Sequence, residues 1–147
     1  MKYNDAEDLL ASFKPGQVYL FHGKIETEQP HYQVLLNKDF NKTFPMVYLS
    51  VSTTKIEKRE LNREFHNFPK ETLVIVEIGE VSFLKQRSCF DCNSISSCSI
   101  HEIYWEYLGK NAKLVWNIPN NILQKIYQWI LVSPAVSDAT KKAIWIL

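Results

Sequence analysis

His31, in the stretch EQPHYQVLLNKDF, stands directly after a proline and directly before an apolar run. Pro30 restrains the residue before it, and the run that follows is typical of a strand, so His31 is predicted to open that strand. Small β-proteins usually place their binding residues on loops and strand ends. An imidazole, with an ordinary pKa of about 6.5, exchanges protons at neutral pH. The position favours a general acid or base, although a plain strand-end histidine is the commoner explanation.

A second group of polar side chains follows the run MVYLSVS, where the sequence continues TTKIEKRE. The hydroxyls of Thr53 and Thr54 lead directly into Lys55 and two further cations, Lys58 and Arg59. Hydroxyls donate hydrogen bonds and flexible cations neutralise charge, so this combination suits the oxygens of a phosphate group. Because glutamates are interleaved with the cations, a polar strand end leading into a solvated loop is the alternative interpretation.

The stretch FLKQRSCFDCN carries charged residues at alternating positions. If it is extended, Lys85, Arg87, Cys89 and Asp91 share one face, because successive side chains of a strand point to opposite faces. Two cations and a carboxylate then lie together and form a candidate phosphate-binding face. An edge strand that carries charge to prevent the addition of another strand has the same pattern.

Three cysteines and a histidine, Cys89-x2-Cys92-x5-Cys98-x2-His101, have the ligand number and the two-residue spacings of a small zinc site. The five-residue middle is short for wrapping both pairs around one ion. A strand would also direct Cys89 and Cys92 to opposite faces. We therefore expect no metal and no other cofactor, with a structural zinc as the alternative, and free thiols in a reducing compartment.

The elements that must position these residues are short strands. The chain of 147 residues, 46% of them hydrophobic, suffices for one domain, which is predicted to span 1–147. After a short helix or irregular arm at Asp5–Phe13, the runs QVYLFHG, HYQVLLN, FPMVYLSVS and TLVIVEI read as strands separated by turn residues. No convincing helix is predicted between this arm and residue 100. The pattern predicts a small antiparallel barrel over about 16–97.

The C-terminal third has a different period. Ile118 and Pro119 form a helix start, after which apolar residues recur at spacings of three and four. A second helix is predicted after Pro134, with one apolar stripe made of Val136, Ala139, Ala143 and Ile146. The predicted fold class is therefore mainly β, a barrel followed by helices over about 118–147.

Composition excludes some classes of function. Seventeen Lys and Arg balance sixteen Asp and Glu, giving a formal charge of +1, so no global basic field indicates a nucleic-acid partner. The first thirteen residues, MKYNDAEDLLASF, lack the continuous apolar run of a signal peptide, and no segment reaches the roughly 20 apolar residues of a membrane span. These observations predict a cytoplasmic protein without a membrane partner.

Several of these segments, taken in order, resemble the MazF/PemK-type toxins of bacterial toxin–antitoxin pairs. The resemblance covers Pro15 to about Asn93 and includes GQVY for the family's opening strand, Pro30 before an apolar strand, and the strand-ending pair Thr53-Thr54. It implies an SH3-like barrel, usually dimeric, that cleaves single-stranded RNA without a metal. Where the family has an arginine that opens the second strand, this chain has Gln29, which carries no charge.

The resemblance implies one reaction for the candidate residues, the cleavage of RNA. RNA cleavage needs a group that takes the 2′-hydroxyl proton, a donor to the leaving 5′-oxygen and positive charge on the phosphate. We expect the catalytic residues His31, Thr53 and Lys85 to line one groove. His31 would supply the acid–base function, and Thr53 together with Lys55 or Lys85 would hold the phosphate. Substrate-binding candidates are the remaining polar residues of the same segments, namely Thr54, Lys55, Arg87 and Asp91.

Two further functions stay open. A catalytically silent barrel could bind an antitoxin, nucleic acid or, as in the related CcdB type, DNA gyrase. A zinc-stabilised interaction module is the other. The expected partners of the favoured reading are single-stranded RNA, an antitoxin protein and a second copy of the chain.

Overall fold

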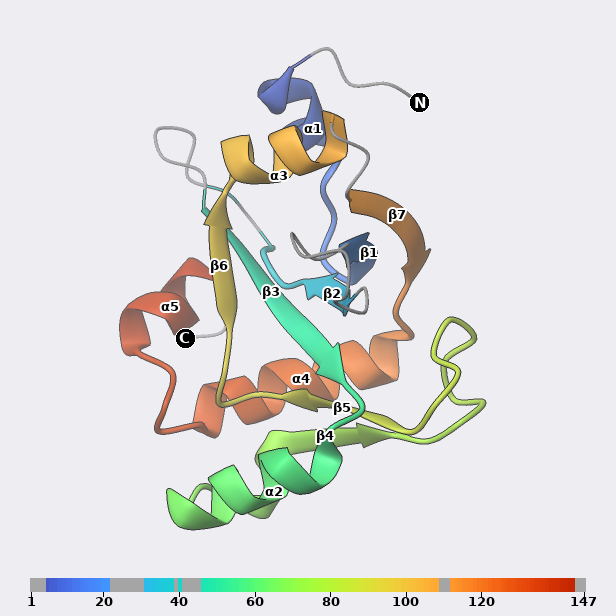
Figure 1. The fold of residues 1–147 in the computed structure, drawn as a ribbon. Helices are drawn as coiled ribbons and strands as arrows, with labels where there is room; N and C mark the ends of the chain where they lie inside the picture. Colours follow the sequence, from blue (N-terminus) through green and yellow to red (C-terminus); the bar gives the residue numbers. More distant parts are fainter. Residues whose placement is uncertain (1–4, 22–30, 39, 41–45, 109–111, 145–147) are drawn as a thin grey trace.

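The computed structural model describes residues 5–21, 31–38, 40, 46–108 and 112–144 of the chain (Figure 1). Its strands are β1 (Gln17–Phe21), β2 (His31–Leu35), β3 (Met46–Thr53), β4 (Leu73–Val76), β5 (Ser88–Asp91), β6 (Ser96–Ser99) and β7 (Ala112–Asn117). Its helices are α1 (Ala6–Ser12), α2 (Ile56–Phe65), α3 (Ile100–Leu108), α4 (Asn120–Val132) and α5 (Asp138–Ala143), with a 3₁₀ turn at Lys70–Thr72. The mainly antiparallel sheet and the C-terminal helices agree with the predicted class.

The strands form one sheet in the order β4-β5-β3-β2-β1-β7, and β6 also pairs with β3. Every ladder between these strands is antiparallel. Among the described residues no ladder joins β4 to β7, so the sheet is open and the barrel closure expected from the sequence is not observed there.

The long strand β3 has two partners on one side, because β6 pairs with its first half and β5 with its end. On β3, Leu49 pairs with Ser96, and Ser52 lies three residues later. In a continuous antiparallel ladder its partner would lie three residues before Ser96, but Ser52 pairs with Phe90, which lies six residues before Ser96. The segment between β5 and β6 therefore contains three extra residues. This insertion bends the sheet and separates two pairing regions along β3.

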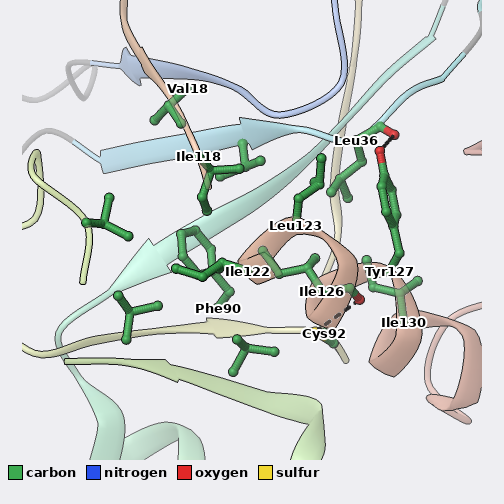
Figure 2. Packing of buried hydrophobic residues seen from close by; sticks show 14 of the residues in the cluster. Val18, Leu36, Phe90, Cys92, Ile118, Ile122, Leu123, Ile126, Tyr127 and Ile130 are labelled. Carbon is green, nitrogen blue, oxygen red and sulfur yellow. Dashed lines mark hydrogen bonds between the residues drawn. The ribbon is translucent and has the colours of Figure 1, made fainter. Parts of the chain in front are cut away.

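Two apolar clusters hold α1, α3 and α4 on the sheet. The larger contains Val18, Val34 and Phe90 from the strands and the buried residues of α4, which are Ile122, Leu123, Ile126, Tyr127 and Ile130 (Figure 2). The smaller lies under α1 and α3 and contains Leu9, Leu35, Leu49 and Ile103. The helix predicted from the spacing of apolar residues after Pro119 is confirmed as α4, whose buried residues recur at three and four.

Three elements differ from the sequence expectation. Helix α2 lies before residue 100, where no convincing helix is predicted. The sequence assigns no element to the residues of α3, which begins at Ile100, or to those of strand β7, which pairs with β1. Helix α2 has no buried residue, so it lacks the apolar stripe that reveals a helix in a sequence. The pattern of β7 is obscured by a register shift opposite Val18 and Tyr19.

The last helix is shorter than expected and has a different buried face. Val136 is buried as predicted, but Ala139 and Ala143 are exposed, and Ile146 lies outside the described residues. Lys141 and Ile144 are buried instead. The Lys141 ammonium donates to the carbonyl of Ser133 at 2.9 Å, just beyond the last turn of α4, where the helix dipole favours a cation.

The hydroxyl of Tyr127 links α4 to the sheet and gives the first prediction. It donates to the Leu36 carbonyl at 2.6 Å (Figure 2). Tyr127→Phe is expected to lower the free energy of unfolding at neutral pH by about 1–3 kcal/mol, because a buried acceptor loses its donor. Burial raises the pKa of Tyr127 to about 12. The stability that depends on the protonated phenol is therefore present below the ordinary pKa of about 10 and is lost as the pH rises through the folded value.

Urea unfolding at neutral pH and at about pH 11 measures both effects. The variant should be the less stable protein at neutral pH and should lose less stability on going to alkaline pH. The buried thiols contribute to the alkaline loss in both proteins, so the difference between them isolates the phenol. Equal alkaline losses would show that Tyr127 ionises as easily in the folded chain as in the unfolded one.

Candidate functional site

Most of the candidate residues lie at one end of the sheet. Because neighbouring strands are antiparallel, the start of β2 at His31, the end of β3 at Thr53 and the start of β5 at Ser88 meet at the same end. The rings of Tyr32 and Phe83, whose centroids are 5.0 Å apart, hold the segment before β5 against β2. The topology thus brings together strand ends from three separate parts of the sequence.

His31 and Thr53 point to the same face of this sheet. Gln33 and Val51 are direct cross-strand partners, and His31 and Thr53 each lie two residues further toward the strand end. Residues two apart in a strand share a face. We call His31, Gln33, Val51 and Thr53 the strand-end surface.

Exposure increases along this face toward the strand end. The pair Leu35 and Leu49 is buried under α1 and α3, and the pair Gln33 and Val51 is half-buried. At the strand end His31 is exposed and Thr53 is half-buried. In Figure 1, α1 and α3 lie at one end of β3 and α2 at the other. The strand-end surface lies on the stretch of sheet between these helices, and His31 is its exposed residue.

The hydroxyl of Thr53 is oriented by its own chain. Its Oγ1 accepts the backbone N–H of Lys55 at 3.1 Å, so the hydroxyl proton is free to be donated to another acceptor. Thr54 and Lys55 are exposed at the junction between β3 and α2. Two candidate substrate-binding residues therefore adjoin the strand-end surface.

The other two cations of the prediction are placed differently. Strand β5 begins only at Ser88, so Lys85 and Arg87 lie outside it, and the expectation that they share a strand face with Cys89 and Asp91 is wrong. Lys85 is exposed and donates to the Ser82 carbonyl at 3.3 Å. Arg87 donates to Glu77 at 2.8 Å, and this contact raises the Arg87 pKa. Within the described residues, no hydrogen bond or ion pair joins either cation to His31 or Thr53.

Asp91 is buried and acts within the fold. Its Oδ1 accepts the backbone N–H of Asn93 at 3.0 Å, and its Oδ2 lies 3.5 Å from a guanidinium nitrogen of Arg59 on α2. In the sequence Arg59 is only one cation of a polar run, because nothing there shows that α2 packs against β5.

The cysteines are not assembled as a metal site. Cys89 is buried opposite Thr53, Cys92 is buried and its thiol donates to the Ile126 carbonyl at 3.6 Å, and Cys98 lies on β6 opposite Val47. Burial raises the pKa of Cys89 to about 11 and that of Cys98 to about 12, so both are thiols at neutral pH. In the described parts of the chain, no three His, Cys, Asp or Glu side chains are grouped as metal ligands.

No protein-family model matches the chain, and no curated protein matches it. None of the described helices is long and apolar enough to cross a bilayer. The strand-end surface is therefore the candidate functional site.

Proposed function

We propose that the chain is a toxin-like, metal-independent endoribonuclease that cleaves single-stranded RNA at the strand-end surface. One observation carries this proposal: the register between β2 and β3 directs His31 and Thr53 to the same face at the same end of the sheet. An exposed imidazole and an oriented hydroxyl, with Lys55 beside them, provide a proton acceptor, a hydrogen-bond donor and a positive charge.

The reaction needs no group beyond these side chains. His31 takes the proton from a ribose 2′-hydroxyl, whose oxygen attacks the adjacent phosphorus. The bond from phosphorus to the 5′-oxygen breaks, and that oxygen leaves with a proton returned by the imidazolium or delivered through water. Thr53 donates to a non-bridging oxygen and Lys55 neutralises part of its charge. The products are a 2′,3′-cyclic phosphate and a 5′-hydroxyl.

The finer fold assignment follows the same proposal. The antiparallel sheet with β3 shared between two pairing regions supports an open relative of the SH3-like barrel of MazF/PemK-type toxins. Within this proposal, the natural partners are an antitoxin and a second copy of the chain.

The test is cleavage of a mixed pool of single-stranded RNA by the purified chain in the presence of a chelator. We expect fragments that end in 2′,3′-cyclic phosphate, which end-group analysis distinguishes from the 3′-phosphate or 3′-hydroxyl ends left by other nucleases. Intact RNA after prolonged incubation would contradict the nuclease assignment.

A second candidate, a binding module without catalysis, is favoured by a different observation. Large apolar side chains are exposed on two helices and an edge strand, with Phe65 85% and Trp105 69% accessible, joined by Leu61 and Trp116. Exposed aromatic residues of this kind are enriched at protein interfaces. Uncut RNA together with tight binding of an oligonucleotide, or of a small acidic protein encoded beside this gene, would favour this candidate.

A further inference from the structure

The three arginines of the chain differ in how their guanidinium groups are engaged. Arg63 uses all of its nitrogens, donating to Glu60 at 3.2 Å and to the Phe68 carbonyl at 2.8 Å. Arg87 donates to both carboxylate oxygens of Glu77. The guanidinium of Arg59 donates no hydrogen bond within the described residues, and its one ion pair, with Asp91, is long at 3.5 Å.

Arg59 also borders the strand-end surface. Asp91 and Cys89 are two residues apart on β5 and share a face, and Cys89 is the cross-strand partner of Thr53. Arg59 reaches this face from α2 through its contact with Asp91. Its positive charge also opposes the rise in the Cys89 pKa that burial causes, as expected of a cation close to that thiol.

Asp91 and Arg59 differ in the exposure of their side chains, and this difference indicates the function of the ion pair. The Asp91 side chain is 7% exposed and anchored to the backbone of Asn93, whereas the Arg59 side chain is 40% exposed. A buried carboxylate therefore lies on one side of a guanidinium that donates no hydrogen bond within the described residues and whose side chain is partly exposed. Such an arrangement leaves the planar fork free to bind a phosphate in two contacts.

We propose that Arg59 is the cation that holds an RNA phosphate at the strand-end surface, with Asp91 as the positioning residue that fixes its guanidinium. The inference rests on the proposed function and gives Arg59 the role that the sequence assigns to Lys85. Because an arginine fork binds two phosphate oxygens at once, it also orients the phosphate toward His31 and Thr53. A lysine at this position supplies charge without this orientation.

The test measures binding of a 2′-O-methyl oligonucleotide, which lacks the attacking hydroxyl and is not cut. Arg59→Ala is expected to weaken binding by roughly 10–100-fold and to reduce the slope of log affinity against log salt by about 0.7, the contribution of one phosphate contact to a single strand. Lys125→Ala removes the same charge from an exposed residue of α4, which packs on the other face of the sheet, and should change affinity by less than about threefold. Arg59→Lys should keep the salt slope but recover only part of the affinity.

A second variant distinguishes a role of Arg59 in phosphate binding from a role in the stability of the fold. Arg59→Ala leaves the buried Asp91 carboxylate without its ion pair and can destabilise the fold. Arg59→Ala/Asp91→Asn removes both charges, so this folded double variant should show the same weakened binding and reduced slope. If the wild type binds and cuts RNA and these variants bind equally well, the role of Arg59 is wrong and the proposed function stands. Wild type that neither binds nor cuts overturns the proposed function together with this inference.

Discussion

His31→Ala is expected to slow the cleavage of single-stranded RNA by roughly 10²–10⁴-fold, the range for losing one acid–base group. Alanine can neither take the 2′-hydroxyl proton nor return one to the leaving oxygen. Because His31 is exposed at the start of β2 and contributes nothing to either apolar cluster, the fold should remain intact. Single-turnover cleavage of a labelled oligonucleotide measures the rate, and circular dichroism with thermal unfolding checks the fold.

His101→Ala is the matched control for this experiment. His101 is also exposed but lies on α3, away from the strand-end surface, so its removal should leave the rate within about twofold of wild type. Equal rates for His31→Ala and wild type would remove His31 from the reaction.

Phe90→Ala is expected to lower the free energy of unfolding by about 3–5 kcal/mol, the largest effect on stability among the predicted changes. Phe90 is the largest fully buried side chain of the described residues and lies between β5 and helix α4 (Figure 2). Its removal leaves a cavity at the point where the sheet and α4 meet, which neither element can fill without moving. Denaturant unfolding at neutral pH measures the change.

Phe65→Ala provides the same substitution at a position that is 85% exposed on α2. It should change the free energy of unfolding by no more than about 0.5 kcal/mol. If Phe65→Ala lowers the free energy of unfolding as much as Phe90→Ala does, α2 is covered in solution. A binding module that self-associates through α2 would show this result. Sedimentation at several protein concentrations would then identify the association.

The sequence predicts those elements in which the spacing of apolar residues follows the buried face. Strand β3 alternates between the buried face of Val47 and Leu49 and the face of Tyr48, and α4 repeats at three and four because one of its sides packs on the sheet. Helix α2 was missed because it buries no side chain and its acids and cations suit a solvated loop equally well. Local pattern thus reveals an element only where packing has selected its residues.

The same limit applies to the candidate site. His31 and Thr53 were identified from their positions at strand ends, and the register places both on one face. The pairing of Arg59 with Asp91 joins residues far apart in sequence, and it depends on how α2 folds back onto β5. The role predicted for Lys85 depends on a strand that begins before Ser88, whereas β5 begins at Ser88. Contacts set by tertiary packing cannot be inferred from spacing alone.

The position of β7 in the sheet has a consequence for synthesis on the ribosome. β1 lies between β2 and β7, and about 90 residues separate the end of β1 from the start of β7. At about 5–20 residues per second, the outer edge of β1 stays unpaired for roughly 5–18 s after β1 is made. An open edge recruits other strands. The nascent chain therefore passes through a state in which the edge of Gln17–Phe21 is open to pairing with other strands, and this state ends only when Ala112–Asn117 leaves the exit tunnel.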